Sequence, residues 1–180
     1  MKYELAKALK EYNIETLSIP EDKKGLKPIN WKIIDSLDRN SKVIIKTSQG
    51  DITMQLFQER APGSVANFVE LVNAKFYDGK PFHRVVPNFV IQTGCPRGDG
   101  FGSLDFTIRS ELAGSYYDDE GYVGMASAGL HTEGTQFFIT HSPTPHLDGR
   151  YTIFGKVISG MDVVRQISMG DTIKEINIEY

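Results

Sequence analysis

The stretch FHRVVPNFVIQ, residues Phe82 to Gln92, decides how this chain folds. Its valine, isoleucine and phenylalanine residues are typical of buried strands, and Pro87-Asn88 separates them into two runs. The stretch therefore predicts two strand segments joined by a turn. It also contains one guanidinium, Arg84, and one neutral amide, Gln92, with no carboxylate between them. Most arginines on edge strands keep their head groups in water, so other segments must decide what Arg84 does.

Further short strands are predicted on both sides of this stretch. On its N-terminal side, KVIIKT and DITMQLF flank a turn at Gly50 and indicate a β-hairpin. On its C-terminal side, apolar runs separated by glycine and proline predict strands at Tyr122–Ala128, Gln136–Thr140, Thr152–Val157 and Ile173–Tyr180.

Two helices are predicted between these strands. Residues Pro62–Ala74 carry apolar side chains at i, i+3, i+4 and i+7 from Val65 onward, and Pro62 suits a first helical turn. A shorter helix is predicted at Met161–Ser168. Many short strands with two helices favour a mainly β fold built as a closed antiparallel barrel.

Residues 1–40 differ in composition and predict a partly helical N-terminal extension. Tyr3–Tyr12 has the spacing of a short helix, and a linker containing Pro20, Gly25 and Pro28 follows it. A second helix is predicted at Trp31–Leu37, where Asn30 could act as the N-cap.

The apolar residues of that second helix need a partner. Together they present more apolar surface than an isolated short helix can leave in water: Ile29, Trp31, Ile33, Ile34 and Leu37. They could pack on the barrel, on a second copy of the chain or on an upstream domain. Packing on the barrel is the simplest of the three, and we take it as the expectation.

Composition favours one main globular domain. The chain has 180 residues and a net charge of -3, so binding to nucleic acid or anionic lipid is not expected as its main activity. No run reaches transmembrane length, and the N-terminus lacks the apolar core of a signal peptide. The single cysteine, Cys95, cannot form an internal disulfide. These features predict a cytoplasmic location.

Three later segments identify the family that the chain resembles. MASAG (125–129), GTQFFIT (134–140) and LDGRYTIFGKV (147–157), together with FHRVVPNFVIQ, are similar in order and spacing to cyclophilin-type peptidyl-prolyl cis/trans isomerases. The resemblance runs from about Lys42 to Tyr180. It implies a closed eight-stranded antiparallel β-barrel with a helix covering each end. It also implies an isomerase domain at residues 41–180, preceded by the extension at residues 1–40.

The resemblance implies an activity and a set of site residues. Family members accelerate rotation about X-Pro bonds in flexible or unfolded protein segments and assist folding, without a cofactor or metal ion. Arg84 matches the arginine of the family's FHR motif, which donates to the prolyl nitrogen in the twisted state. Gln92 matches the amide that binds substrate and helps to hold that arginine. The remaining matches are the proline pocket (Phe89, Phe138, Leu147), its margin (Val90, Met125) and the peptide groove (Ala126, Ser127, Gln136).

Three groove positions depart from the best-known family members. Ser127, His146 and Tyr151 stand where those members have asparagine, tryptophan and histidine. That tryptophan is an important cyclosporin contact in the family, so His146 predicts weakened binding of the drug. Tyr151 can still stack near a proline and offers a hydroxyl, so activity is expected to persist.

Other sequence features favour no competing chemistry. The loop Cys95–Ser103 fits neither glycine-rich phosphate-binding template and is expected to be a flexible surface loop. The acidic run 118–120 is typical of a solvated loop, and the histidines in residues 131–146 lack metal-ligand spacing. The main alternative is a binding module that holds proline-containing peptides for a partner, with residues 1–40 as the attachment. Arg84 favours catalysis, since binding alone requires no donor under the prolyl nitrogen.

Overall fold

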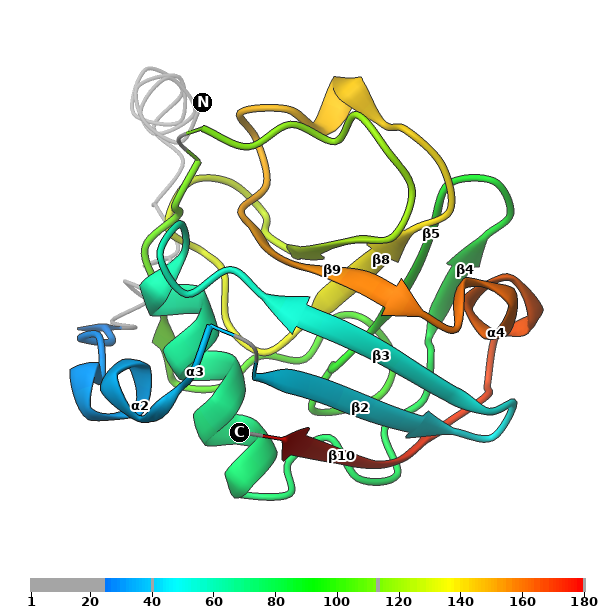
Figure 1. The fold of residues 1–180 in the computed structure, drawn as a ribbon, viewed down its shortest axis with the longest axis horizontal. Coiled ribbons are helices and arrows are strands. Elements are labelled where there is room, and N and C mark those ends of the chain that lie inside the picture. The colour runs from blue at the N-terminus through cyan, green and yellow to red at the C-terminus, as the bar shows by residue number, and fades with distance from the viewer. Residues whose placement is uncertain (1–24, 40, 113, 180) are drawn as a thin grey trace, which may run out of the picture.

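The structure, a computed structural model, describes residues 25–39, 41–112 and 114–179 and is built on one large antiparallel sheet (Figure 1). Its eight strands follow one another across the sheet in the order β10 (Ile173–Glu179), β2 (Lys42–Thr47), β3 (Asp51–Leu56), β9 (Ile153–Ser159), β7 (Tyr122–Met125), β8 (Phe137–Thr140), β5 (Val90–Thr93) and β4 (Arg84–Val86). The hairpin predicted around Gly50 is formed by β2 and β3. The prediction of a mainly β, eight-stranded antiparallel fold is confirmed.

The two edges of this sheet meet beside β4 and β10. Pro81 and Thr172 form an antiparallel bridge, and four backbone hydrogen bonds of 2.7–3.0 Å join residues 79–82 to residues 170–173. The strand β4 has only three residues and does not itself pair with β10 in the described part of the chain. The sheet therefore curls into a barrel whose seam is made by the segments that precede β4 and β10.

Two helices cover opposite ends of the curled sheet (Figure 1). Helix α3 (Pro62–Asn73) buries the face that the sequence spacing predicts: Val65, Phe68, Val69 and Val72. Helix α4 (Met161–Gln166) ends two residues before its predicted end and buries Val164. Within the described ranges, no helix is long and apolar enough to cross a membrane.

The barrel core is centred on Phe68 of α3. Its ring lies 5.3–5.6 Å, between centroids, from the aromatic rings of Tyr77, Phe137 and Phe154. Such aromatic contacts add to the stabilisation that burial of apolar surface provides. The helix thus fixes β8 and β9, and these strands carry or adjoin the residues predicted to form the site.

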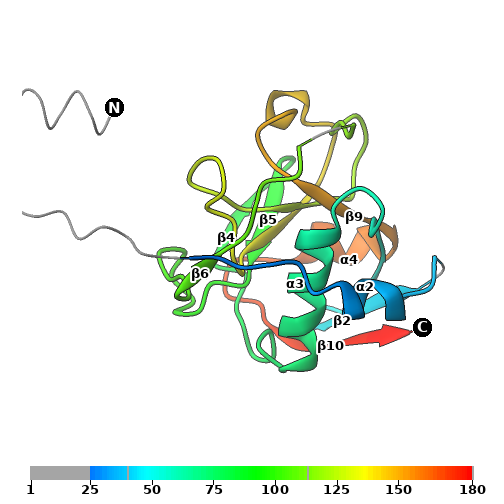
Figure 2. The ribbon, with the colours of Figure 1, turned by 90° about the vertical axis from the view of Figure 1, so that its left-hand side faces the viewer.

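The described part of the extension lies against the barrel (Figure 2). The strand β1 (Gly25–Leu26) pairs in parallel with β6 (Phe106–Thr107), and helix α2 (Trp31–Ser36) packs beside α3. Three of the apolar residues that were expected to need a partner pack against the barrel core: Ile33, Ile34 and Leu37. The helix predicted at Tyr3–Tyr12 lies outside the described residues.

Two details of the extension differ from the expectation. Trp31 leaves 57% of its surface exposed. It is the first residue of a six-residue helix, and the residues that reach the core lie further along the chain. Asn30 is the N-cap residue of α2 but makes no side-chain cap; its amide nitrogen donates to Glu70 Oε1 at 2.6 Å. The prediction of a packed Trp31 is therefore wrong, and Asn30 has the predicted position without the predicted side-chain hydrogen bond.

Candidate active site

The candidate site begins on the β4–β5 hairpin, which is the stretch FHRVVPNFVIQ. The two strands pair in the register Arg84↔Gln92, and Phe89 N closes the turn by donating to Val86 O at 3.0 Å. Asn88 has a φ of 60°, a left-handed conformation that asparagine tolerates better than most residues. The predicted turn therefore forms. Since side chains directly opposite in an antiparallel pair share a face, Arg84 and Gln92 come together.

Strands β7 and β8 add an aromatic surface beside this hairpin. Phe138 lies opposite Gln92 on β5 and opposite Gly124 on β7. A Cβ atom on Gly124 would lie 2.2 Å from Tyr117 Oη and 2.5 Å from Phe138 Cζ, so only glycine fits there. The Tyr117 and Phe138 rings stack with their centroids 5.9 Å apart. Burial raises the pKa of the Tyr117 phenol, which therefore stays protonated and donates to Tyr151 O at 3.4 Å.

A cavity of about 220 Å³ lies over these residues. Its lining consists of residues that the sequence predicts for the site: Arg84, Phe89, Val90, Gln92, Ala126, Ser127, Phe138, Leu147 and Tyr151. The Phe138 and Tyr151 rings meet edge to face, with 5.7 Å between centroids, and both pack with buried Leu147. The cavity therefore has an apolar side and a polar side that contains Arg84 and Gln92.

Arg84 is the cation of this cavity, and its side chain is exposed. Its Cζ lies 5.6 Å from the centroid of the Phe89 ring, a cation–π contact. Its Nη1 donates to Gln92 Oε1 at 3.5 Å, near the upper limit for a hydrogen bond. Arg84 makes no ion pair and no other hydrogen bond within the described residues. Because a guanidinium carries five N–H donors, most of those on Arg84 are available to a ligand.

Two further side chains hold Gln92 in place. Gln92 Nε2 donates to Gln136 Oε1 at 3.0 Å, and Gln136 Nε2 donates to the carbonyls of Gly100 and Gly102, both at 3.0 Å. The loop that supplies these carbonyls folds around Cys95, whose Sγ accepts hydrogen bonds from Gly100 N and Gly102 N at 3.2 Å. The glycine-rich loop, expected to be flexible, thus makes specific contacts that steady the site.

The predicted residues His146, Gln136 and Met125 are not part of the cavity lining. His146 is exposed on the short helix η1 (Pro145–Leu147), with its ring 5.2 Å from that of Phe89 at an interplanar angle of 30°. Gln136 accepts a hydrogen bond from the Gln92 side chain. Met125 is 1% exposed and belongs to the barrel core. Its side chain therefore supports the β7 wall from inside the barrel.

Sequence reasoning did not foresee the parts played by Tyr117, Gly124 and Cys95. A glycine inside a predicted strand is a signal of close approach, and Gly124 carried that signal. Tyr117 and Cys95 had none, because a tyrosine or cysteine in a loop is compatible with many environments. Their contacts depend on which distant segments the barrel brings together.

Comparisons with known proteins show which family the chain belongs to. The family model described as cyclophilin type peptidyl-prolyl cis-trans isomerase/CLD matches residues 42–179. The chain is 50% identical over 129 residues to "Peptidyl-prolyl cis-trans isomerase B" of Bacillus subtilis, which covers 71% of this chain and 90% of that protein. It is 41% identical over 156 residues to a peptidyl-prolyl cis-trans isomerase of Helicobacter pylori, covering 84% of this chain and 96% of that protein.

Solved structures give the same result. A cyclophilin type peptidyl-prolyl cis-trans isomerase of Cryptosporidium parvum, crystallised in the presence of the dipeptide Ala-Pro, has a TM-score of 0.73 and 33% sequence identity. The similarity covers 77% of this chain and 99% of that one. The division of the chain at residue 40 stays a prediction, but the family match begins close to it. The chain belongs to the cyclophilin-type peptidyl-prolyl cis-trans isomerase family.

Proposed function

We propose that this protein accelerates cis/trans isomerisation of X-Pro bonds in flexible protein segments, with Arg84 as its catalytic residue. The observation that carries the proposal is a guanidinium on the polar side of a cavity whose other side is apolar, with most of the guanidinium donors uncommitted. The relatives from Bacillus subtilis and Helicobacter pylori are named for the same reaction. The substrates of such an activity are proline-containing segments of proteins that are folding.

Rotation about an X-Pro bond breaks no covalent bond. Its barrier of roughly 18–20 kcal/mol comes from amide resonance, and uncatalysed exchange takes on the order of tens to hundreds of seconds. A catalyst must therefore bind the twisted amide more tightly than the planar one. In the twisted state the prolyl nitrogen regains a lone pair, so a donor directed at that nitrogen stabilises this state selectively.

The chemistry of Arg84 suits this task. A guanidinium stays charged at any working pH, and its planar fork can contact the prolyl nitrogen and the proline carbonyl oxygen together. The Phe89 ring and the Gln92 amide restrict where the fork lies, and neither neutralises it because neither carries a charge. These two contacts bias the orientation of the donor before substrate binds, which lowers the cost of orienting it during rotation.

The apolar side of the cavity supports binding of the prolyl ring. Phe138 and Leu147 are 5% and 7% exposed, and Tyr151 packs against Phe138 at the cavity wall. Apolar walls that meet a few placed polar groups are the usual form of a site that orients a ligand. The Cryptosporidium parvum relative was crystallised in the presence of Ala-Pro, which supports proline-containing peptides as the ligands.

NMR exchange spectroscopy on a proline tetrapeptide tests this proposal, because it requires no protease. Wild type should raise the exchange rate, and Arg84→Ala should lower turnover roughly 10²- to 10³-fold, as loss of one preorganised donor does. A titration should find the peptide still bound by Arg84→Ala. If wild type binds the peptide without changing its exchange rate, the protein is a binding module. Full activity in Arg84→Ala would remove the catalytic role of Arg84.

A further inference from the structure

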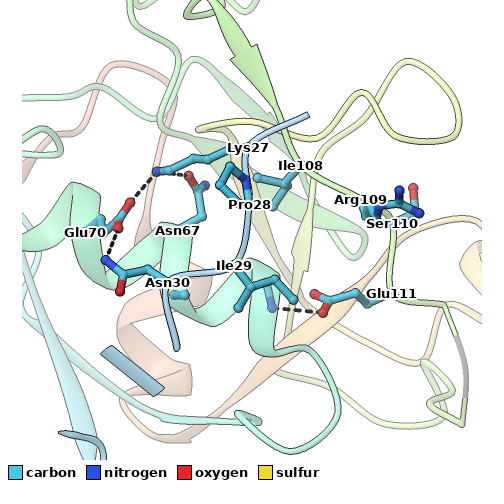
Figure 3. Close-up of a pocket in the computed structure, with 12 residues that line it drawn as sticks. Lys27, Pro28, Ile29, Asn30, Asn67, Glu70, Ile108, Arg109, Ser110 and Glu111 are labelled. Carbon is cyan, nitrogen blue, oxygen red and sulfur yellow. Dashed lines mark hydrogen bonds and ion pairs between the residues drawn. The ribbon is translucent and has the colours of Figure 1, made fainter. Parts of the chain in front are cut away.

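A cavity of about 250 Å³ lies where the extension meets the barrel (Figure 3). Residues of the extension, of α3 and of the segment 108–111 line it. Four of its polar side chains bind one another: Lys27 Nζ contacts Glu70 and donates to Asn67 Oδ1 at 3.0 Å, and Asn30 also donates to Glu70. Because these four groups bind one another across the boundary between the extension and α3, we treat this part of the cavity as a junction between segments.

Lys27 makes most of the contacts at this junction. Its backbone N donates to Thr107 O at 2.8 Å, and its Nζ lies 4.5 Å from the centroid of the Phe106 ring. Burial by itself raises the pKa of Glu70, but hydrogen bonds from Lys27 and Asn30, with the charge of Lys27, lower it below its ordinary value. Glu70 is therefore ionised near neutral pH, and it forms an ion pair with the ammonium group alongside the separate Lys27–Asn67 hydrogen bond.

Asn67 connects Lys27 to the segment that contains Gly134. Asn67 is 2% exposed; its Oδ1 accepts from Lys27, and its Nδ2 donates to Gly134 O at 2.7 Å. An amide has one accepting end and one donating end, so an ammonium on Oδ1 directs Nδ2 toward Gly134. Without Lys27, a buried Oδ1 would lose its partner and the amide orientation would no longer be fixed.

Lys27 also bonds to β6, and the residue that follows β6 contacts the segment next to Gly134. Just after β6, Ile108 N donates to Glu133 O at 2.9 Å, next to Gly134. Residues 133–134 are thus held by α3 on one side and by the β6 segment on the other, and Lys27 contacts both. Two residues further on is Gln136, whose side chain bonds Gln92 opposite Arg84.

We propose that Lys27 is a positioning residue of the isomerase site, acting through Asn67 and Gly134 on Gln136. The kinetic part of this inference rests on the proposed function, whereas the structural part does not. Lys27 lies outside residues 42–179, the part of the chain that matches the family model. The extension is therefore part of the working site in this chain and not only an attachment.

The effect of Lys27 on Gln136 is partial, because Thr135 has anchors of its own. Tyr77 Oη donates to Thr135 O at 3.0 Å, and Thr135 Oγ1 donates to Gly94 O at 2.7 Å. Loss of Lys27 should therefore shift Gln136 without releasing it. This predicts a modest kinetic change together with a clear local spectroscopic change.

The test compares Lys27→Met with Lys32→Met in the full chain. Methionine keeps the apolar stem and removes the charge, and Lys32 is an exposed α2 residue with no side-chain hydrogen bond or ion pair within the described ranges. Lys27→Met should shift the side-chain amide NMR signals of Gln136 and Gln92 and lower kcat/KM for a proline tetrapeptide about threefold. Lys32→Met should change neither.

Glu70→Gln separates positioning from stability. It removes the ion pair of Lys27 but leaves the Lys27–Asn67 contact, so it should lower Tm while leaving the Gln136 and Gln92 signals in place. The proposal is overturned if Lys27→Met lowers Tm but leaves these signals and kcat/KM unchanged, or if Glu70→Gln shifts the signals equally. If wild type lacks isomerase activity, the proposed function fails, and the amide signals alone still decide whether Lys27 positions Gln136.

Discussion

Arg84 and Lys27 are two cations beside cavities of similar volume, about 220 and 250 Å³, but their partners differ. Arg84 has one long hydrogen bond to a neutral amide and a contact with an aromatic ring. Lys27 has an ion pair with Glu70, a hydrogen bond to Asn67 and a cation–π contact. Within the described residues Arg84 has no carboxylate partner, and in our proposal it is the cation that contacts the substrate.

The difference shows how a cation can be held without being neutralised. Gln92 orients Arg84 through a carbonyl oxygen, and the other end of the same amide is fixed by Gln136. If a carboxylate replaced this neutral amide, it would form a bidentate ion pair with the guanidinium. The N–H donors used in that pair would then be unavailable to a substrate. At Lys27 the carboxylate of Glu70 is present, and the ion pair that they form joins the extension to α3. Cavity volume does not separate these two cases, whereas the charge of the partner does.

Among the substitutions that retain charge at the site, the largest effect is expected when the shape of the Arg84 cation is changed and its charge is kept. Arg84→Lys replaces a planar fork by a point charge on a flexible stem, so turnover should fall by about 10²-fold. Peptide affinity, measured by NMR titration, should change little because the apolar side of the cavity is intact. Wild-type turnover in Arg84→Lys would mean that charge alone suffices and that the fork geometry has no role.

A smaller effect is expected when Arg84 is given the kind of partner that Lys27 has. Gln92→Glu puts a carboxylate of nearly the same size as the amide opposite Arg84. The resulting ion pair should lower kcat/KM by roughly 10- to 100-fold. Gln166→Glu on α4 is a matched control, since Gln166 is exposed and is not among the residues that line the cavity. Unchanged kcat/KM in Gln92→Glu would contradict the view that Arg84 must stay uncommitted.

The residues around Arg84 could be predicted from the sequence, whereas the contacts around Lys27 could not. Arg84, Gln92 and Phe138 could be foreseen because strand alternation and register bring them to one surface and the family motifs name them. Lys27, Asn67 and Gly134 could not, because nothing local indicates that residues 40 and 67 positions apart will share hydrogen bonds. Packing of α2 was expected from its apolar residues, but not which of them would remain exposed.

His146 gives a test of the rim of the cavity that Arg84 occupies. The His146 ring packs on Phe89 but is exposed, where the best-known family members have tryptophan. We expect weak cyclosporin binding in wild type, and His146→Trp should raise affinity roughly tenfold because buried tryptophans dominate such interfaces. Calorimetric titration with the drug measures both values. Nanomolar binding by wild type would contradict the weakened contact assigned to His146.

The smallest effect concerns the ion pair that holds Lys27. The folded pKa of Glu70 lies below its ordinary value, so the stabilisation is complete above the unfolded pKa and is lost as pH falls through the folded one. It should contribute no more than about 1 kcal/mol, since the pair is partly solvated. In thermal unfolding, wild type should therefore have a higher Tm than Glu70→Gln near neutral pH, and this difference in Tm should become smaller below a pH of about 4. Glu179→Gln, at an exposed residue of β10, is the control.

The most direct test measures Arg84→Ala and Lys27→Met side by side with wild type, using exchange spectroscopy on one proline tetrapeptide and thermal unfolding of the same samples. Arg84→Ala should lose turnover roughly 10²- to 10³-fold with little change in Tm, because its guanidinium has few partners in the fold. Lys27→Met should lose activity only about threefold and should lower Tm. Equal losses of activity in the two variants, or retained activity in Arg84→Ala, would contradict the claim that the uncommitted cation performs the catalysis.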